Sequence, residues 1–310
     1  MVDNRILLKL KSVSPKILAF ARILKVGIIW DHLSSYFLKL NFKNINFWLK
    51  RLKYYFSIWF IMSKNSFLMI LNQKSVLLIF LAGKILRFIF FATFLFFLVS
   101  GAKDVAGYNS TQAVFFFLTF AVIDTTSQFL FREVYRFRTY VVNGDLDLIL
   151  VKPVNALFRV LMGGADFIDF ITIPPLYAVT YYVGSLLTPS PFQVFLYFLL
   201  IITGLLMTTA FHIIVMALGI VTLEVDHTIM IYRDITNMGR FPIDIYREPL
   251  RSALTYFIPV SLMISLPAKA FMGLAGFDFI LFAIFAAFAF LYISLRFWNF
   301  ALKKYSSASS

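Results

Sequence analysis

Long, uninterrupted apolar blocks constrain this chain more than any other feature of its sequence. They begin near residue 76 and recur to about residue 299, as in the block at 192–206. Of the 310 residues, 61% are hydrophobic and only 14% are charged, whereas soluble domains have about 45–50% apolar and about 25% charged residues. A water-soluble fold could not hide this much apolar surface behind so few charges. The sequence therefore predicts an integral membrane protein.

The continuity of the blocks predicts helices. A transmembrane barrel needs strands in which polar and apolar residues alternate, and these blocks do not alternate. A bilayer core about 30 Å thick is crossed by about 20 residues of helix. Six segments reach that length, roughly 76–100, 112–131, 165–187, 192–222, 250–273 and 278–299. The predicted fold class is an all-α, polytopic membrane protein with six transmembrane helices.

The basic residues between the spans predict their orientation, because Lys and Arg concentrate in cytosolic loops. The three short loops on one side contain a single basic residue, Lys103. On the other side, Lys303 and Lys304 follow the last span. The basic residues of the two longer loops are Arg132, Arg136, Arg138, Lys152 and Arg159, then Arg233, Arg240, Arg247 and Arg251. We therefore predict that both termini and both longer loops are cytosolic.

The N-terminal part differs in character from the rest. Residues 1–75 carry 13 Lys or Arg and two acidic residues, with aromatic side chains interleaved. Apolar residues recur there at helical spacing, which predicts an interfacial helix on anionic lipid headgroups. A further span at 54–71 is disfavoured, because polar residues interrupt it. The chain thus divides into a basic segment, 1–75, a six-helix domain, 76–300, and a tail, 301–310, predicted to be disordered.

The sequence excludes several kinds of chemistry. It has no cysteine, so disulfides, thiolate metal sites and cysteine nucleophiles are absent. The net charge of +14 is typical of topology signals and does not indicate nucleic-acid binding. Gly83-Lys84 lacks the spacing and the following hydroxyl of a phosphate-binding loop. Glu224, Asp226 and His227 are too few to complete a metal site without distant ligands. We predict no metal and no cofactor bound by this chain.

Polar residues inside the predicted spans are candidates for a translocation path, because charge in a bilayer is costly. Asp124 and Gln128 lie in the second span, Asp166 and Asp169 near the cytosolic end of the third, and His212 in the fourth. They form either a polar path for a substrate or protons, or structural contacts. In the structural alternative, the carboxylates pair with Arg132, Arg136 or Arg159 or face a subunit interface, and His212 serves packing or hydrogen bonding between helices.

The loop between the second and third spans has the pattern of a short, capped helix. Asn143-Gly144 permits a tight turn, and Asp145 can cap a short helix after it. Asp147 would add negative charge at the positive N-terminal end of that helix, which stabilises it. Its apolar face would consist of Leu146, Ile149 and Leu150. We interpret this helix as a docking element for a protein partner. The alternative is an interfacial helix that only rests on lipid.

The residues that follow this helix complete the pattern. Lys152 precedes Pro153, which ends the helix, and a second helix can begin near Asn155. The whole block, Gly144-Asp145-Leu146-Asp147-Leu148-Ile149-Leu150-Val151-Lys152-Pro153-Val154-Asn155-Ala156-Leu157-Phe158, resembles the G-x-L-D-x-x-L-x-(K/R)-P-x-N-x-L-F stretch of ABC-2 family transporter permeases. The segments at 107–112, 239–246, 258–260 and 266–268 resemble further family patterns, so the resemblance covers about 76–300.

The resemblance implies a permease subunit of an ATP-binding cassette exporter in a cell membrane, plasma or inner, of a prokaryote. Such subunits work as pairs, homodimeric or paralogous, and each docks on a separate ATPase subunit that binds ATP and Mg. The implied mechanism is alternating access, driven through the loop at 143–158. Pro259 and Pro267 in the fifth span would let that helix bend.

Two rival functions use the same polar residues. A membrane-embedded, lipid-modifying enzyme would use Asp124, His212 and Glu224, but the sequence lacks a polar cluster dense enough to position a reacting group. An ion-coupled secondary transporter would use Asp124 and Asp166. It would be expected to show internal repeats with matching broken helices, and the sequence shows none.

Overall fold

The computed structural model describes residues 42–101, 106–222 and 225–306. It is 84% helix, and the described residues contain no strand, which confirms the predicted all-α class. Backbone contacts divide the chain into two units, Met1–Ile58 and Trp59–Ser310. Most of the basic N-terminal segment lies outside the described residues, as do Glu224 and residues 307–310 of the tail.

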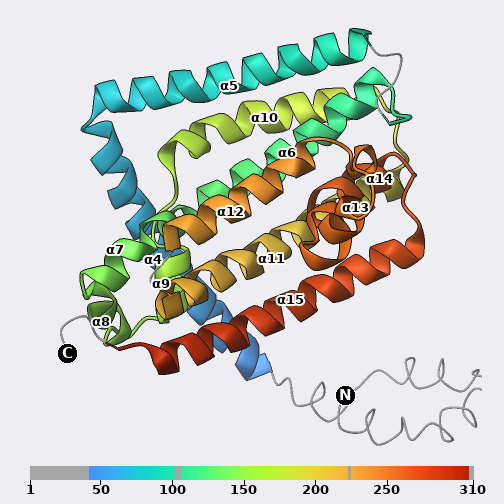
Figure 1. Cartoon of the computed structure of the whole chain (residues 1–310). Helices are drawn as coiled ribbons and strands as arrows, with labels where there is room; N and C mark the ends of the chain where they lie inside the picture. Colours follow the sequence, from blue (N-terminus) through green and yellow to red (C-terminus); the bar gives the residue numbers. More distant parts are fainter. Residues whose placement is uncertain (1–41, 102–105, 223–224, 307–310) are drawn as a thin grey trace, which may run out of the picture. The chain divides into compact units, whose positions relative to one another are not determined.

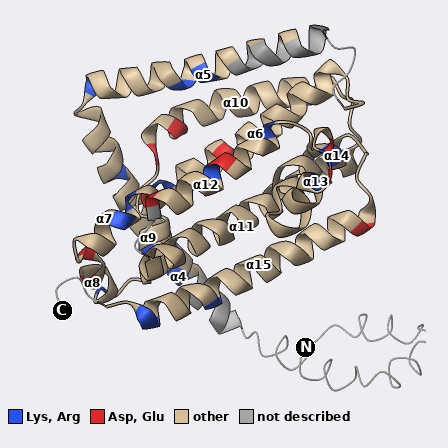
Figure 2. Cartoon of the chain, in the orientation of Figure 1, with Lys and Arg blue, Asp and Glu red and all other residues tan. Residues whose placement is uncertain are grey.

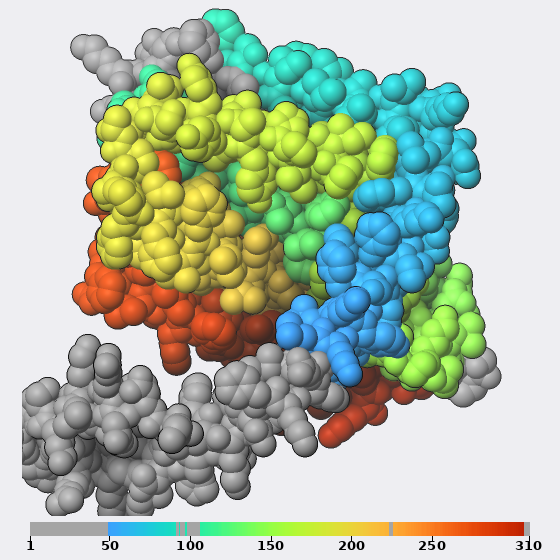
Figure 3. Space-filling view, turned by 180° about the vertical axis from the view of Figure 1, so that it is seen from behind, coloured from blue at the N-terminus to red at the C-terminus, as the bar shows by residue number. Residues whose placement is uncertain are grey.

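Five long helices form the frame of the second unit (Figure 1). They are α5 (Lys74–Gly101), α6 (Ser110–Phe131), α10 (Phe167–Ser185), α11 (Pro191–Thr222) and α15 (Phe277–Lys304). Most α6 side chains are buried, because α10, α11 and α5 all contact this helix. Viewed from behind, α10 lies beside α5, and α15 forms the opposite edge of the unit (Figure 3).

The start of α6 shows how the sequence sets a helix boundary. Asn109 caps the helix through its side chain, which accepts from the Gln112 amide at 2.9 Å, and the Gln112 side chain accepts from the Asn109 amide at 3.0 Å. This reciprocal capping box satisfies two backbone donors that would otherwise lack partners. Before it, Gly107 has a φ of +81°, a conformation that glycine adopts without strain.

The helix before α5 runs in a different direction. Two residues separate helix α4 (Phe42–Leu71) from α5. The chain bends by 99° there, between Leu49–Leu71 and Lys74–Phe90. The last part of α4 lies against the segment before α10, where the Ala165 amide donates to Ser63 Oγ at 3.1 Å. Phe67 packs on Phe167 and Phe170. The polar residues near Asn72 thus mark a sharp turn between two helices.

The second long loop is not confined to one end of the bundle, and this corrects the sequence prediction. Helix α12 (Val225–Asn237) continues through η3 (Met238–Arg240) and η4 (Ile243–Ile245). Its first turn pairs with α7 (Phe137–Val142), beyond the C-terminal end of α6, through Arg138 and Asp226 at 3.6 Å. At the other end, the Tyr108 hydroxyl donates to Asp244 at 2.8 Å, just before α6 begins. Residues 226–244 therefore run along the whole of α6.

The reason for this error is the placement of the arginines. They were taken as solvated loop residues, but Arg233 and Arg240 lie partly buried over the rings of Tyr135 and Phe120, at 5.6 and 5.5 Å. Figure 2 shows charged residues between α6 and α12, midway along the helices. A count of basic residues cannot distinguish such interior positions from a cytosolic loop.

The predicted fifth span, 250–273, is a broken segment, as the bend expected at its prolines implies. It consists of α13 (Leu250–Ser252), η5 (Ala253–Phe257), η6 (Ser261–Ser265) and α14 (Leu266–Phe271), and it bends by 75°. Pro259 lies at the break, where its missing N–H and its ring prevent a continuous helix. Pro267 lies in the first turn of α14, a position that proline favours.

Length and apolar composition identify three helices that could cross a membrane, Ser110–Val142, Pro191–Thr222 and Phe277–Lys304. Each of the bent pairs, α4 with α5 and 250–257 with 261–271, could supply one more, which gives up to five among the described residues. The predicted count of six is therefore only partly supported.

Candidate functional site

The loop between α6 and α10 folds into a compact group of short helices. They are η2 (Arg132–Arg136), α7, α8 (Asp145–Leu150) and α9 (Ala156–Leu161). Gly144 precedes α8 with a φ of +79°, so the predicted left-handed turn is confirmed. Gly144 itself occupies the cap position, and Asp145 is the first helical residue rather than the cap. Asp145 and Asp147 lie in the first turn, where negative charge is favourable.

The buried face of α8 points into the protein. Leu146 and Ile149 are buried in a hydrophobic cluster with Phe137 and Trp298, so the prediction that these two side chains dock on a partner is wrong. A helix this short is unstable alone, and burial of these side chains stabilises its position. The exposed apolar residues are instead Leu148, Leu150 and Val151, which are 60, 39 and 81% exposed.

A buried carboxylate ties this loop together. Glu133 in η2 pairs with Arg159 in α9 at 3.0 Å and with Arg136 at 3.6 Å, and Tyr140 of α7 donates to it. Burial alone would lower the pKa of Arg159, but the hydrogen bond to Glu133 and its negative charge outweigh burial and raise that pKa. Glu133 was not among the residues predicted from the sequence. Its position among arginines at the end of a predicted span was the available signal.

Two further residues shape the same loop. Asn155 caps α9, since its side chain accepts from the Phe158 amide at 3.0 Å, which confirms the predicted start of a second helix. Gly163, just after α9, packs closely against Arg159. A Cβ at this position would lie 2.2 Å from Arg159 Nη1 and 2.7 Å from the Arg159 carbonyl oxygen. Lys152 and Pro153 are exposed between the two helices.

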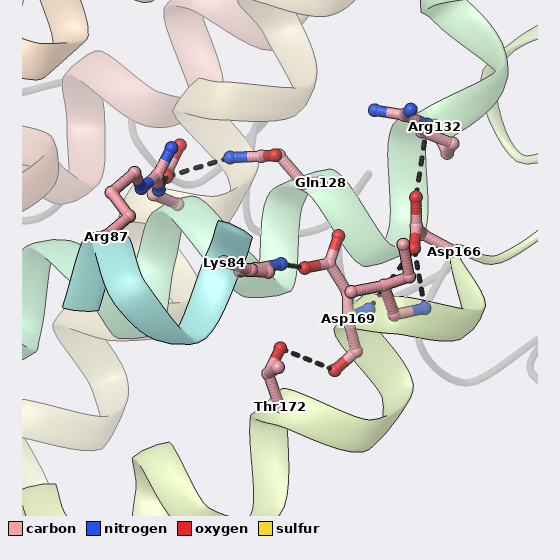
Figure 4. A network of polar contacts seen from close by, with 9 residues as sticks. Lys84, Arg87, Gln128, Arg132, Asp166, Asp169 and Thr172 are labelled. Atoms are coloured by element: carbon pink, nitrogen blue, oxygen red, sulfur yellow. Dashed lines mark hydrogen bonds and ion pairs between the residues drawn. The ribbon is translucent and has the colours of Figure 1, made fainter. Parts of the chain in front are cut away.

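The carboxylates of the third predicted span pair with cations on neighbouring helices (Figure 4). Asp166 caps α10 by accepting from the Ile168 and Asp169 amides at 2.8 and 3.2 Å, and it pairs with Arg132 at 3.1 Å. Asp169 pairs with Lys84 of α5. The structural alternative for these two residues is therefore the one observed, although Lys84 was not among the expected partners.

Asp124 is on α6, and its side chain contacts α5. It accepts from Gln128 at 2.8 Å and pairs with Arg87 of α5 at 3.7 Å. It also borders a small cavity that Gln128, Arg233 and His212 line as well. The structure thus brings together Asp124, Gln128 and His212, three of the predicted path residues, whereas Asp166 and Asp169 do not line this cavity.

His212 has the contacts of a packed residue. It is fully buried, its Nδ1 lies 2.8 Å from the Thr208 carbonyl oxygen one turn earlier, and its ring contacts Phe131 and Tyr232. Among the described residues, the Nε2 atom has no hydrogen-bond partner. The described residues contain no group of three side chains that could hold a metal ion, and Asp226 of the candidate triplet pairs with Arg138.

A second polar cluster lies at the opposite end of the bundle from α8. Asp244 accepts from Tyr108 and pairs with Arg251 at 2.8 Å and Lys269 at 2.6 Å. Burial raises the pKa of Asp244, but the hydrogen bonds from Lys269 and Tyr108 and the two positive charges outweigh burial and lower that pKa below its ordinary value. The cluster fastens the bent segment 250–271 to the α5–α6 connection.

The comparisons with known proteins agree with the resemblance seen in the sequence. The chain matches no curated protein and no solved structure. A family model described as "ABC-2 family transporter protein" matches residues 81–309, which include most of α5, every later span-length helix, the loop with α8 and the buried carboxylates. The chain therefore belongs to the ABC-2 family of transporter proteins, and it is a multi-pass membrane protein.

Proposed function

We propose that the chain is the permease subunit of an ABC exporter, in which a separate ATPase subunit binds ATP and Mg and drives transport. Two permease chains, identical or paralogous, would form the pathway in a prokaryotic cell membrane. The family membership supports this role, because a permease of this family works with an ABC ATPase. The observation that carries the proposal is the exposed apolar face of α8.

The proposed topology has six crossings. They are α5, α6, α10, α11, the segment 225–243 and α15, so the segment 225–243 replaces 250–273 as the fifth and Asp244 lies just beyond its end. The ends of α6 and the contacts of residues 226–244 support this assignment. Arg136, Arg138 and Lys152 belong to the same loop as α8, and Lys303 and Lys304 lie in the last turn of α15. Figure 2 shows basic residues on this group of short helices and at the nearby end of α15. These basic residues favour a cytosolic position for this end.

The docking surface consists of Leu148, Leu150 and Val151. Two of these exposed apolar side chains lie on the six-residue helix and Val151 follows it directly, and all three are costly to leave in water. A hydrophobic groove on the ATPase would cover them. The opposite face of α8 is packed into the cluster with Phe137 and Trp298, so a push on α8 would reach α7 and α15 directly.

The buried carboxylate extends this connection to α6. Glu133 follows α6 directly and pairs with Arg159, so displacement of α9 would pull on the end of α6. For ATP to drive such a shift, the ATPase must bind the two permease conformations with different affinities. The loop would then transmit that difference to the crossings.

The experiment replaces the exposed face. Leu148→Asp with Val151→Asp should leave folding intact, because both side chains are solvent-exposed, but would bury two charges at the contact with the ATPase. We expect the ATPase that copurifies with the wild-type chain, identified by mass spectrometry, to be lost from the double variant at matched expression. Leu274→Asp, an exposed leucine beyond α14 at the opposite end, is the control. Equal recovery of the ATPase with the double variant would contradict the proposal.

A further inference from the structure

A cavity of about 260 Å³ lies beside the Asp244 cluster, at the end of the bundle opposite α8. The side chains that line it come from η4, the loop after η4, the bent segment 250–271 and the first turn of α15. Its volume is close to the lower end of the range for small-molecule pockets, about 300–1,000 Å³. The cavity is therefore large enough for a small polar group, and not only for single waters.

Acidic and basic side chains line this cavity without pairing with each other. Arg251 and Lys269 both pair with Asp244, at 2.8 and 2.6 Å. Glu248 accepts from the amide and the hydroxyl of Ser252, and it has no ion-pair partner among the described residues. Two cations and two carboxylates balance, so the site is neutral overall, but its positive and negative groups are separate.

Hydrogen-bonding groups on the cavity wall remain available to a ligand. Ser261 lines the cavity and is only 5% exposed, and no described residue forms a hydrogen bond with its hydroxyl. Buried hydroxyls normally have a partner. Arg251 and Lys269 each have more N–H donors than their bonds to Asp244 use. Both bonds from Ser252 go to the same oxygen of Glu248, so its other oxygen, Oε1, is also available.

The place of the cavity in the fold favours a lipid headgroup as its occupant. Phe279, on the cavity wall, lies in the first turn of α15, a helix that is long and apolar enough to cross a membrane. The cavity is thus level with the end of this helix, where lipid headgroups lie. Tyr256 also lines the cavity, and Phe257, which follows it, is 82% exposed. Aromatic side chains are typical of this level of a membrane, and an acyl chain could lie against them.

We propose that this cavity binds the phosphoethanolamine headgroup of a membrane phospholipid. The phosphate accepts from Arg251 and Lys269, the ammonium group donates to Glu248 Oε1, and Ser261 adds a further hydrogen bond. This headgroup has one charge of each sign and no net charge, as the site requires. Charge-assisted hydrogen bonds of this kind are the stronger ones. The inference concerns a site apart from α8 and does not depend on docking of an ATPase.

The proposal predicts which phospholipids the site rejects. Phosphatidylglycerol brings a phosphate but no cation for Glu248, so its binding leaves that carboxylate unpaired. Phosphatidylcholine brings a cation, but its three methyl groups replace the N–H donors that a carboxylate would accept from. Both lipids should therefore bind more weakly than phosphatidylethanolamine, although all three have the same phosphodiester.

The test measures which lipid the full chain retains. The purified protein in an uncharged detergent is equilibrated with an equimolar mixture of the three lipids, with identical acyl chains, and retained lipids are counted by native mass spectrometry. We expect the wild type to retain phosphatidylethanolamine over each of the other two by at least about tenfold, as for one charge-assisted hydrogen bond. Glu248→Gln should remove this preference. Arg251→Gln should lower retention of all three lipids several-fold, because all three have the phosphate.

The controls separate the cavity from general effects of charge and from soluble ligands. Asp278→Asn removes an exposed carboxylate in the first turn of α15 that does not line the cavity, and it should keep the preference of the wild type. Glycerophosphoethanolamine, which has the same headgroup without acyl chains, should not displace the lipid at equal concentration.

Four results would overturn the proposal. They are equal retention of the three lipids by the wild type, an unchanged preference in Glu248→Gln, unchanged retention in Arg251→Gln, and loss of the preference in Asp278→Asn. Displacement by glycerophosphoethanolamine at the concentration of the lipid would assign the cavity to a soluble ligand and would overturn the role of the membrane.

Discussion

Glu133, Arg159 and Gly163 show how single residues fix the loop at the proposed cytosolic end. The carboxylate of Glu133 is almost fully buried, and it is satisfied by two arginines and Tyr140. Gly163 lets the chain pass close to Arg159. A buried charge that keeps its partners can be tolerated, whereas one that loses them strongly destabilises the fold.

Gly163→Ala should therefore destabilise the protein. The added Cβ would overlap both the guanidinium and the carbonyl of Arg159, at 2.2 and 2.7 Å, and would push the arginine away from Glu133. Overpacking of this kind costs about 1–3 kcal/mol. We expect a lower melting temperature in detergent, measured by thermal unfolding. Gly83→Ala, where no atom lies within 4 Å of the new Cβ, is the control, and a melting temperature equal to that of the wild type in Gly163→Ala would refute the argument.

At the scale of elements, the sequence predicted the helices that are apolar throughout and missed the one that carries charge. The spans near α5, α6, α10, α11 and α15 were located to within a few residues. The segment 225–245 was taken for a loop, because Arg233, Arg240 and Asp244 interrupt it. Their contacts with Tyr135, Phe120 and Tyr108 come from distant parts of the chain, and no local pattern reveals such contacts.

The candidate site shows the same division. The turn at Gly144 and the cap at Asn155 follow from local rules and were predicted. Which face of α8 is buried was predicted wrongly, since it depends on Phe137 and Trp298. The Pro259 break was anticipated as a bend, but the 75° angle between its two arms depends on how 261–271 packs against α11.

Asp244 provides a pH-dependent attachment of the bent segment 250–271. Because its pKa is lower in the folded protein than the unfolded value of about 3.9, its contribution to stability is fully present above the unfolded value. The contribution is lost as the pH falls through the lower, folded value. We expect thermal unfolding between pH 6 and pH 3 to show a smaller acid-induced loss for Asp244→Asn than for the wild type.

A matched variant isolates this effect from general acid destabilisation. Asp278 is exposed in the first turn of α15, so Asp278→Asn removes a carboxylate from the same end of the bundle without breaking a cluster. It should keep the acid dependence of the wild type. If Asp244→Asn and Asp278→Asn respond identically, the Tyr108–Asp244–Lys269 cluster does not fasten this segment.

For the whole molecule, the number of crossings decides where the arginines lie. If 225–243 crosses the membrane, Arg247 is outside and Lys303 is inside; if 223–249 is a cytosolic loop, both are inside. The natural chain has no cysteine, so single cysteines can be introduced without a background. We expect Arg247→Cys to react with a membrane-impermeant maleimide in intact cells, and Lys303→Cys to react only after permeabilisation. Protection of Arg247→Cys in intact cells would restore the loop and remove the fifth crossing.

The difference between the two faces of α8 also bears on how a transporter of this kind could come to use a different ATPase subunit. Leu146 and Ile149 are held by packing against the interior of the subunit, whereas Leu148, Leu150 and Val151 are exposed and do not contribute to that packing. Substitutions on the outer face can therefore accumulate without unfolding the subunit. Under the proposed docking, exchange of Leu148, Leu150 and Val151, with Leu146 and Ile149 kept, should let this subunit bind the ATPase of another transporter.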